Sequence, residues 1–409
     1  MPLTAARSCV AEPIILCFLL CIPFAAQTPR TNPDLTAHEW GTFTSIAGLD
    51  GKAAKWSTLN GSTELPSFVE HIAGIYFKAG LRGTVRMETP VLYLYSPQQT
   101  EVSVKVAFSN GIITEWYPHA SRVTPDGRHF PGSDLFTHKR ARGTIAWDSV
   151  VVSPSAAANF PLDPKSPDDR ENQYYAARET SAPPLLVSTN AGTQQEKFLF
   201  YRGVSSIPIP VSATISAAGQ VRLANLGDDE IPSVILFERR GDKLGYRLGG
   251  ALSGEMSLDA PELNSTVESL SRDLQDVLTS QGLYPDEARA MIATWRGSWF
   301  EEGSRLFYIV PQSYLCANLP LIINPAPEKT VRVFVGRLEL VTPATEQAVR
   351  QILAAHDAIA LQKYTRFLDP ILTKMNQENP AQAQQINAEM DQIYQSGTIR
   401  TYPPYNQQH

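Results

Sequence analysis

The sequence predicts a β-rich α+β fold, with antiparallel β-sandwich-like domains and with helices concentrated in the C-terminal third. Two observations carry this prediction. Between residues 85 and 250, short runs of alternating apolar and polar residues are separated by turn residues such as Asn110-Gly111, which is typical of antiparallel strands. After residue 260, apolar residues recur at intervals of three and four, which is the spacing of amphipathic helices.

The first 26 residues predict a cleaved signal peptide. Arg7 precedes an apolar run at 14–22, which ends at Pro23-Phe24-Ala25-Ala26. A membrane-spanning helix needs about 20 apolar residues, so this shorter run is typical of an export signal. We therefore expect an exported protein, periplasmic or extracellular, whose mature chain has no transmembrane span. Cleavage leaves one cysteine and no internal disulfide.

Segment 27–182 is expected to form an N-terminal β-rich domain with long loops. Alternation predicts strands, and Gly-, Pro- and Asp-containing stretches predict the loops between them. In chain order, the expected elements are an edge strand at 38–45, a helix at 66–79, a meander at 85–116 with a hairpin turn at Asn110-Gly111, and a strand at 144–152 between loops at 118–142 and 153–178.

Three further segments complete the predicted organisation. Segment 183–255 contains five short strands with turn residues between them, which indicates an immunoglobulin-like β-sandwich module. Segment 256–342 is expected to supply a helix pair, ended by Gly282 and restarted by Pro285, plus strands that pack on the β-domains. Segment 343–409 is expected to form C-terminal helices and a tail.

Charge and motifs exclude several classes of function. The 35 basic and 41 acidic residues give a formal net charge of −6, without a long basic run, so we expect no nucleic-acid partner. The sequence has no Gly-rich phosphate loop, Cys-x-x-Cys pair, His-Glu-x-x-His helix or Gly-x-Ser-x-Gly elbow. These absences remove the simplest enzyme assignments but not enzymes built from scattered residues, and the cofactor is unknown.

Several acidic residues stand beside aromatic residues or within apolar strands. Glycosidases use a pair of carboxylates, and sugar rings pack on flat aromatic faces. The same pattern also arises in ordinary strands, where neighbouring side chains point to opposite faces. The candidate catalytic residues are Glu39, Glu88, Glu115, Glu301 and Glu302, and the candidate substrate-binding residues are Trp40, Trp116, Trp295, Trp299 and Arg305.

The segment 295–305 contains two Trp, two Glu and two Arg residues where a helix is expected to end and a strand to begin. One interpretation is a substrate site. The other is a packed junction with an internal ion pair, for example between Glu302 and Arg305, which would be costly to break.

Histidines are dense in the first third of the chain. His with Asp in loops is suited to zinc or a related ion, although the spacing matches no ligand motif. Solvated loop histidines are the alternative interpretation. The candidate metal ligands are His38, His71, His119, His129 and His138.

Three segments, His38-Glu39-Trp40-Gly41-Thr42-Phe43, Met87-Glu88-Thr89-Pro90-Val91 and Trp299-Phe300-Glu301-Glu302-Gly303, resemble a group of uncharacterised exported proteins from environmental bacteria. The resemblance covers most of the mature chain and implies no activity.

The leading functional hypothesis is an exported cell-envelope protein that binds or processes a glycan-like polymer. One alternative is a metal-dependent hydrolase that uses the His-rich first third. The other is a non-enzymatic envelope scaffold, whose sandwich and C-terminal helices bind protein partners.

Overall fold

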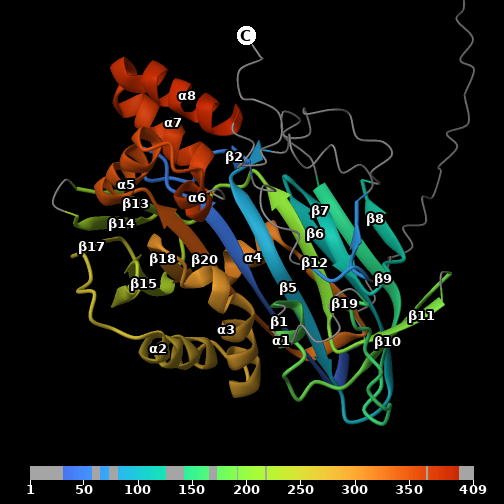
Figure 1. Cartoon of the computed structure of the whole chain (residues 1–409). Coiled ribbons are helices and arrows are strands. Elements are labelled where there is room, and N and C mark those ends of the chain that lie inside the picture. Colours follow the sequence, from blue (N-terminus) through green and yellow to red (C-terminus); the bar gives the residue numbers. More distant parts are fainter. Residues whose placement is uncertain are drawn as a thin grey trace, which may run out of the picture.

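The computed structural model describes residues 31–57, 65–72, 82–125, 142–164, 173–190, 192–216, 219–364 and 367–395. Most of the strands belong to one large mixed sheet (Figure 1). The β-rich α+β class is confirmed, with helices mainly in the C-terminal part. The sandwich-like arrangement is not shown, and the sheet is not purely antiparallel, because its first and last strands pair in parallel.

The large sheet has a main path of neighbouring strands and four strands attached beside it. The main path runs β11 (Gly192–Glu196), β10 (Leu185–Thr189), β9 (Arg142–Val152), β7 (Gly111–Tyr117), β12 (Leu199–Ser205), β5 (Val85–Tyr95), β1 (Thr31–Ile46), β20 (Ala326–Leu340), β18 (Gly303–Ile309), β15 (Ile231–Arg240) and β16 (Lys243–Leu252). The attached strands are β3 (Glu70–His71), β6 (Thr100–Ser109), β8 (Arg122–Thr124) and β19 (Leu321–Asn324).

Strand β1 is central, so the prediction of an edge strand at 38–45 is wrong. It pairs antiparallel with β5 and parallel with β20. Every residue from Ala37 to Ile46 is buried. The alternation at 38–45 suggested an edge strand, whereas the polar residues of that segment are all buried inside the protein.

Two other local predictions in the N-terminal part are wrong. A helix was expected over 66–79, but Glu70–His71 is a short strand that pairs with β7, and residues 73–81 lie outside the described part. Asn110 does adopt a left-handed conformation, with φ of 45°. However, the flanking strands do not form a hairpin, because β6 pairs with β9 and β19 while β7 pairs with β12 and β3. Long-range pairing has overridden both local signals.

The strands of segment 183–255 are divided between two sheets, and an immunoglobulin-like module is not shown. β10, β11, β12, β15 and β16 belong to the large sheet. A separate three-stranded sheet has the order β13 (Val211–Ile215), β14 (Val221–Asn225) and β17 (Glu255–Leu258), and a two-stranded sheet joins β2 (Trp56–Ser57) to β4 (Arg82–Gly83).

Two helices follow the sequence signals closely. α2 (Val267–Ser280) begins at the capping residue Thr266 and is followed by Gly282 with φ of 105°, a conformation that favours glycine. α3 (Pro285–Trp299) begins at the expected proline. Both helices bury apolar residues in one core beside β1, β5 and β20 (Figure 1). The shorter helices are α1 (Gln173–Ala176) and α4 (Gln312–Asn318).

The C-terminal helices form a group at one end of the molecule (Figure 1). Their apolar residues share a core with Ile46 and Trp56. The group consists of α5 (Pro343–Ala354), α6 (Ala358–Leu361), the 3-10 helix Gln362–Tyr364, α7 (Leu368–Glu378) and α8 (Pro380–Gln395). Within the described residues, no helix is long and apolar enough to cross a lipid bilayer.

The close approach of β20 to β18 requires a glycine at position 336. Gly336 pairs with Tyr308, and a Cβ atom there would overlap the Tyr308 ring. We expect Gly336→Ala to lower the free energy of unfolding by about 1–3 kcal/mol, as overpacked cores do. Urea unfolding checks this result. Gly254→Ala is the control, because nothing lies within 4 Å of a Cβ at that position, and an equal loss in both variants would contradict the packing argument.

A carboxylate pair in the C-terminal helices makes stability depend on pH. Burial and the neighbouring Glu346 raise the pKa of Glu378 above its ordinary value of 4.5, against the effect of Lys374. A raised folded-state pKa gives stability that is present at low pH and lost as pH rises through it. We therefore expect Glu378→Gln to unfold at higher urea than the wild type at about pH 7, with the difference shrinking toward about pH 4. Glu389→Gln on α8 is the control for loss of a helix carboxylate. A constant difference across this range would contradict the prediction.

Candidate functional site

Three neighbouring strand pairs carry a β-bulge at the same level of the large sheet. The β1/β5 pairing shifts between Trp40 and Thr42. The β12/β5 pairing shifts between Phe200 and Gly203, and the β12/β7 pairing between Arg202 and Gly203. Bulges redirect side chains and are over-represented beside active sites, so three of them side by side mark this level as a candidate site.

Polar residues occupy this level on all four strands. Residues paired across antiparallel strands point to the same face of a sheet. Thr42 is paired with Glu88, Thr44 with Arg86, and Glu115 with Arg202. We call this set the bulged row: Thr42, Thr44, Arg86, Glu88, Glu115 and Arg202.

The bulged row alternates acids and bases within the protein. Glu88, Glu115 and Arg202 are 1%, 9% and 5% exposed. Arg86 Nε lies 3.4 Å from Glu88 Oε1, and the Thr114 hydroxyl donates to Glu115 Oε2. Buried charges are tolerated only when they are paired and hydrogen-bonded. Among the described residues, the hydroxyls of Thr42 and Thr44 have no hydrogen-bond partner.

A second charge cluster lies where α3 ends, and it corresponds to the packed-junction interpretation. Arg337, which is paired in register with Thr44, donates to Ser298 Oγ at 2.7 Å and also to Glu301. Arg337 and Arg305 both contact Glu339, at 3.3 Å and 2.9 Å.

The predicted pair between the Glu302 and Arg305 side chains does not form. Glu302 pairs with Lys363 at 3.2 Å, while Arg305 Nη2 donates to the Glu302 carbonyl at 2.8 Å. Arg305 is fully buried, so it presents no surface to a substrate.

Three of the predicted aromatic platforms are buried. Trp40, Trp295 and Trp299 are at most 1% exposed. Trp295 stacks on Trp299 with ring centroids 6.5 Å apart, and both rings belong to the core that α3 shares with β1, β5 and β20. None of these rings can offer a face to a sugar. Trp116 is half-buried, and its Nε1 donates to Glu70 Oε2 at 2.8 Å.

Glu39 lies away from the bulged row, in the core on the other face of β1. Arg332 Nε donates to Glu39 Oε2 at 2.6 Å, and the Tyr201 hydroxyl donates to Glu39 Oε1. Burial, together with the charge of Glu39, raises the pKa of Tyr201 well above its ordinary value. This arrangement links β1 to β20 and β12 inside the protein and leaves Glu39 without access to a substrate.

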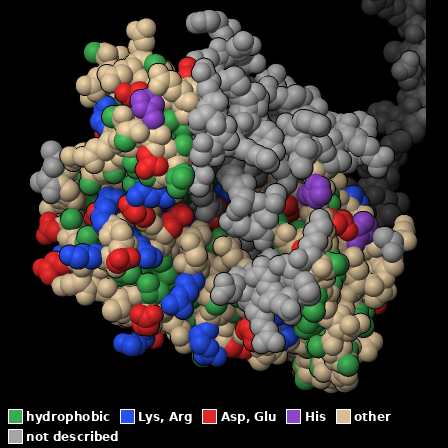
Figure 2. Space-filling view, viewed as in Figure 1, with side chains coloured by type: hydrophobic (Ala, Val, Ile, Leu, Met, Phe, Trp, Pro, Cys, Tyr) green, Lys and Arg blue, Asp and Glu red, His purple; other side chains and the backbone are tan. Residues whose placement is uncertain are grey.

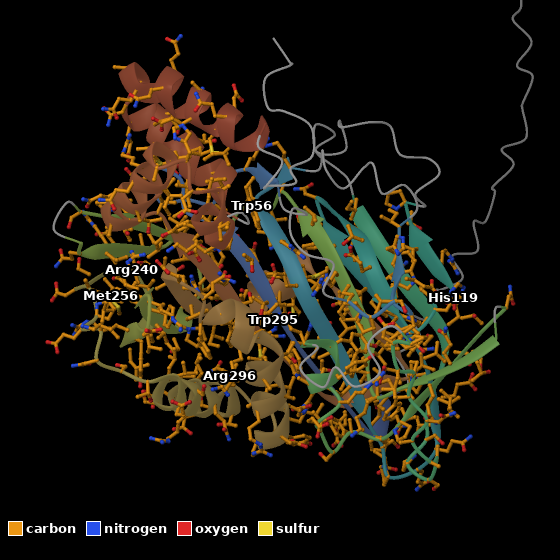
Figure 3. The ribbon with its side chains drawn as sticks, in the orientation of Figure 1. Trp56, His119, Arg240, Met256, Trp295 and Arg296 are labelled. Atoms are coloured by element: carbon orange, nitrogen blue, oxygen red, sulfur yellow. The ribbon has the colours of Figure 1, made fainter. Side chains whose placement is uncertain are left out.

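The predicted metal ligands do not converge. His38 Nδ1 lies 2.8 Å from Glu287 Oε2, His119 pairs with Glu70, and His71 is paired in register with Glu115. His119 lies near one side of the sheet, well away from Trp295 (Figure 3). His129 and His138 lie outside the described residues. Within the described part of the chain, no three His, Cys, Asp or Glu side chains gather in a way that could hold a metal ion.

Sequence reasoning missed Arg86, Arg202 and the two threonines of the bulged row. One signal was present for Arg202, because it is a charged residue inside the apolar run Leu199–Ser205, directly before a glycine. A buried arginine needs a carboxylate partner, and here Glu115 stands opposite. The bulges themselves have no signature in a single sequence.

Comparisons with known proteins do not assign this chain to a family. No protein-family model matches the chain, and no curated protein is a significant match. Among solved structures, the chain is similar to the Danio rerio Fcho1 mu-homology domain with bound Eps15 peptide, at 7% identity and a TM-score of 0.28, over 76% of this chain and 98% of that one. It is also similar to the yeast delta-COP-I mu-homology domain complexed with Dsl1 WxWxV peptide, at 8% identity and a TM-score of 0.25, with the same two coverages. At these TM-scores, neither similarity supports a functional conclusion.

The Glu39–Arg332 pair should be a major determinant of stability. Removing one partner of a buried ion pair leaves an uncompensated charge and costs about 3–5 kcal/mol. We expect Glu39→Ala to lower the free energy of unfolding, measured with urea, by this amount. Glu255→Ala is the control, because Glu255 pairs with Arg222 at side-chain exposures of 62% and 65%, where a pair contributes less than about 1 kcal/mol. Similar losses in the two variants would refute the structural role of Glu39.

Proposed function

We propose that this chain is an exported protein that binds a glycan-like polymer, and that the bulged row is its binding site. The observation that carries the proposal is the alignment of three bulges at a level where acids and arginines alternate. Sugar hydroxyls donate to carboxylates and accept from guanidinium groups, so a row of both types can follow successive hydroxyls of a polymer.

Partly exposed and exposed side chains adjoin the row at its β7 end. His71 is exposed and stands opposite Glu115 in the register. Beyond it, the side chains of Glu70 and His119 are 29% and 38% exposed. Histidines and charged side chains are visible at this side of the space-filling view (Figure 2). A polymer would contact the row at Glu115, which is 9% exposed. Thr42, Thr44 and Glu88 are at most 1% exposed, so binding along the whole row requires the covering residues to move.

Processing of the polymer is a second candidate function, suggested by the presence of two acids in the bulged row. Glu88 on β5 and Glu115 on β7 are separated by one strand, so their backbones lie about 10 Å apart. Inverting glycosidases place their carboxyl groups about 6.5–9.5 Å apart. In that reaction, one carboxyl group protonates the glycosidic oxygen as its bond to carbon breaks. The other takes a proton from the water that attacks the anomeric carbon. Arg86 stabilises negative charge on Glu88, which suits the base.

Retention on insoluble polymers tests the binding proposal. We expect the wild-type protein to sediment with at least one of peptidoglycan sacculi, chitin or cellulose. Glu88→Gln and Glu115→Gln should each weaken retention by about tenfold, because each change removes a charged hydrogen-bond acceptor. Glu255→Gln is the control and should be retained like the wild type, because Glu255 is exposed and lies on β17, outside the large sheet. Circular dichroism confirms that each variant is folded.

The outcomes separate the two candidate functions. Release of new reducing ends by the wild type, lost in both glutamine variants, would support processing. Retention without release supports binding alone. If the wild type sediments with none of these polymers, or if both folded glutamine variants sediment as it does, the bulged row is not a glycan site.

A further inference from the structure

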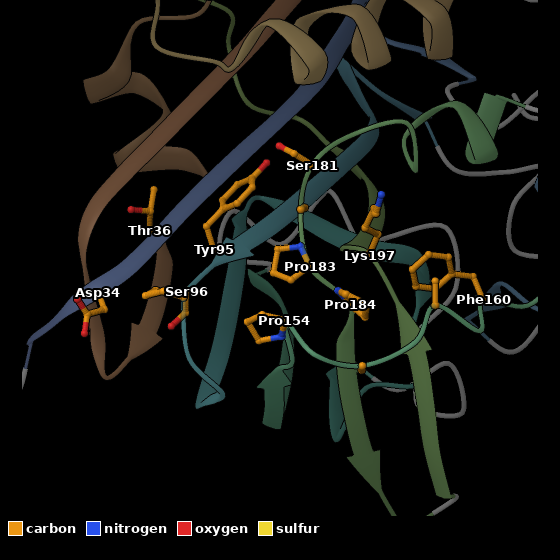
Figure 4. Close-up of a pocket in the computed structure, with 14 residues that line it drawn as sticks. Asp34, Thr36, Tyr95, Ser96, Pro154, Phe160, Ser181, Pro183, Pro184 and Lys197 are labelled. Atoms are coloured by element: carbon orange, nitrogen blue, oxygen red, sulfur yellow. The ribbon is translucent and has the colours of Figure 1, made fainter.

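A pocket of about 700 Å³ opens at the other end of β5 from the bulged row (Figure 4). Tyr95, which ends β5, lines it, whereas Glu88 lies near the start of the same strand. At the rise of a β-strand, the two residues are about 20 Å apart. The pocket is therefore separate from the proposed glycan site, and its volume falls within the range of about 300–1,000 Å³ that is usual for small-molecule sites.

The walls of the pocket are preformed. Pro97, Pro154, Pro183 and Pro184 line it, and proline fixes one backbone dihedral of each loop. The loops are also tied together, since the Pro184 carbonyl accepts from the Ser153 N–H at 2.9 Å. A ligand that binds such walls pays little to order them.

One side of the pocket is held by a buried polar chain. The Tyr95 hydroxyl donates to Glu287 Oε1 at 2.8 Å. Glu287 Oε2 accepts from the Tyr284 N–H at 2.8 Å and lies 2.8 Å from His38 Nδ1. Burial and the charge of Glu287 raise the pKa of Tyr95, so its phenol stays protonated. The Tyr95 ring is thus a fixed, neutral wall.

Lys197 supplies a positive charge to the pocket. Its Nζ donates to the carbonyls of Arg178 and Thr180 at 2.9 Å and 2.6 Å. An ammonium group has three donors, so one remains for a ligand. Burial lowers the pKa of Lys197 below its ordinary value of 10.5, while the charges of Glu179, Asp286 and Glu196 act to raise it. The two groups that accept from Nζ are neutral carbonyls, so an anion gains by accepting a charge-assisted hydrogen bond from the remaining donor.

The opposite side of the pocket disfavours a second negative charge. Asp34, which is exposed, lies across the pocket from Lys197 (Figure 4). Phe160, on the Lys197 side of the pocket (Figure 4), and the proline rings provide apolar surface. The ligand that fits has one anionic group, an apolar body, and a far end that is neutral or cationic.

We propose that this pocket binds a small organic carboxylate, whose anionic group pairs with Lys197 and whose apolar body packs against Phe160 and the proline walls. The site is independent of the proposed glycan site, because it shares no residue with the bulged row.

Titration calorimetry with two matched probes tests the proposal on the intact protein. The probes are 2-naphthylacetate and its amide, which have the same body and differ in charge. We expect the carboxylate to bind about tenfold more tightly than the amide, as a charge-assisted hydrogen bond provides. Lys197→Met should abolish this preference while amide binding persists. Lys243→Met, a change at an exposed lysine on β16, should retain the preference.

The wild-type comparison needs no variant, so the proposal stays testable even if Lys197→Met fails to fold. Equal affinities of acid and amide for the wild type would overturn the assignment of an anionic ligand. A preference that survives in folded Lys197→Met would overturn the role of Lys197. Binding of neither probe would overturn the pocket as a ligand site. Retention on glycan polymers, which involves Glu88 and Glu115, reports separately on the proposed function.

Discussion

The insertion of β1 between β5 and β20 is the constraint on which the rest of the structure depends. Thr31 is paired with Ala326 and Ile46 with Glu339, so the first described strand is closed against the last strand of the sheet. Closing so long a stretch of chain costs conformational entropy. Burial of β1 on both faces offsets that cost. Each side chain of β1 then has a fixed destination.

Side chains on the two faces of β1 have different charged partners. His38 points toward α3 and meets Glu287, whereas Glu39 points to the opposite core and meets Arg332. Further along, the bulge brings Thr42 and Thr44 beside Glu88 and Arg86. Buried ion pairs of this kind add little net stability compared with apolar packing, but they are costly to break singly. These ion pairs therefore help to determine which strands are neighbours. The pairing of β1 with β5 also assembles the bulged row and holds Tyr95 in the wall of the pocket that Lys197 lines.

Sequence reasoning succeeded where local chemistry decides structure. The ends of α2 and α3 follow from Thr266, Gly282 and Pro285, because caps and proline act within one turn. It failed where distant strands decide. The alternation at 38–45 suggested an edge strand, yet the partners of these residues lie about 50 and 290 positions away in the register. Glu88 and Glu115 could be named as candidates from their local sequence. Arg86, Arg202 and the shared bulge could not, because only long-range strand pairing brings them to the same level.

Native-state hydrogen exchange of the β1 backbone tests the central claim most directly. If β1 is the central strand, its amides between Ala37 and Ser45 should exchange only through global unfolding, as amides of core strands do. Amides of β11, at the end of the sheet, should exchange by faster local opening. Exchange of β1 as fast as that of β11 would show that β1 is not held between β5 and β20, and would contradict the account.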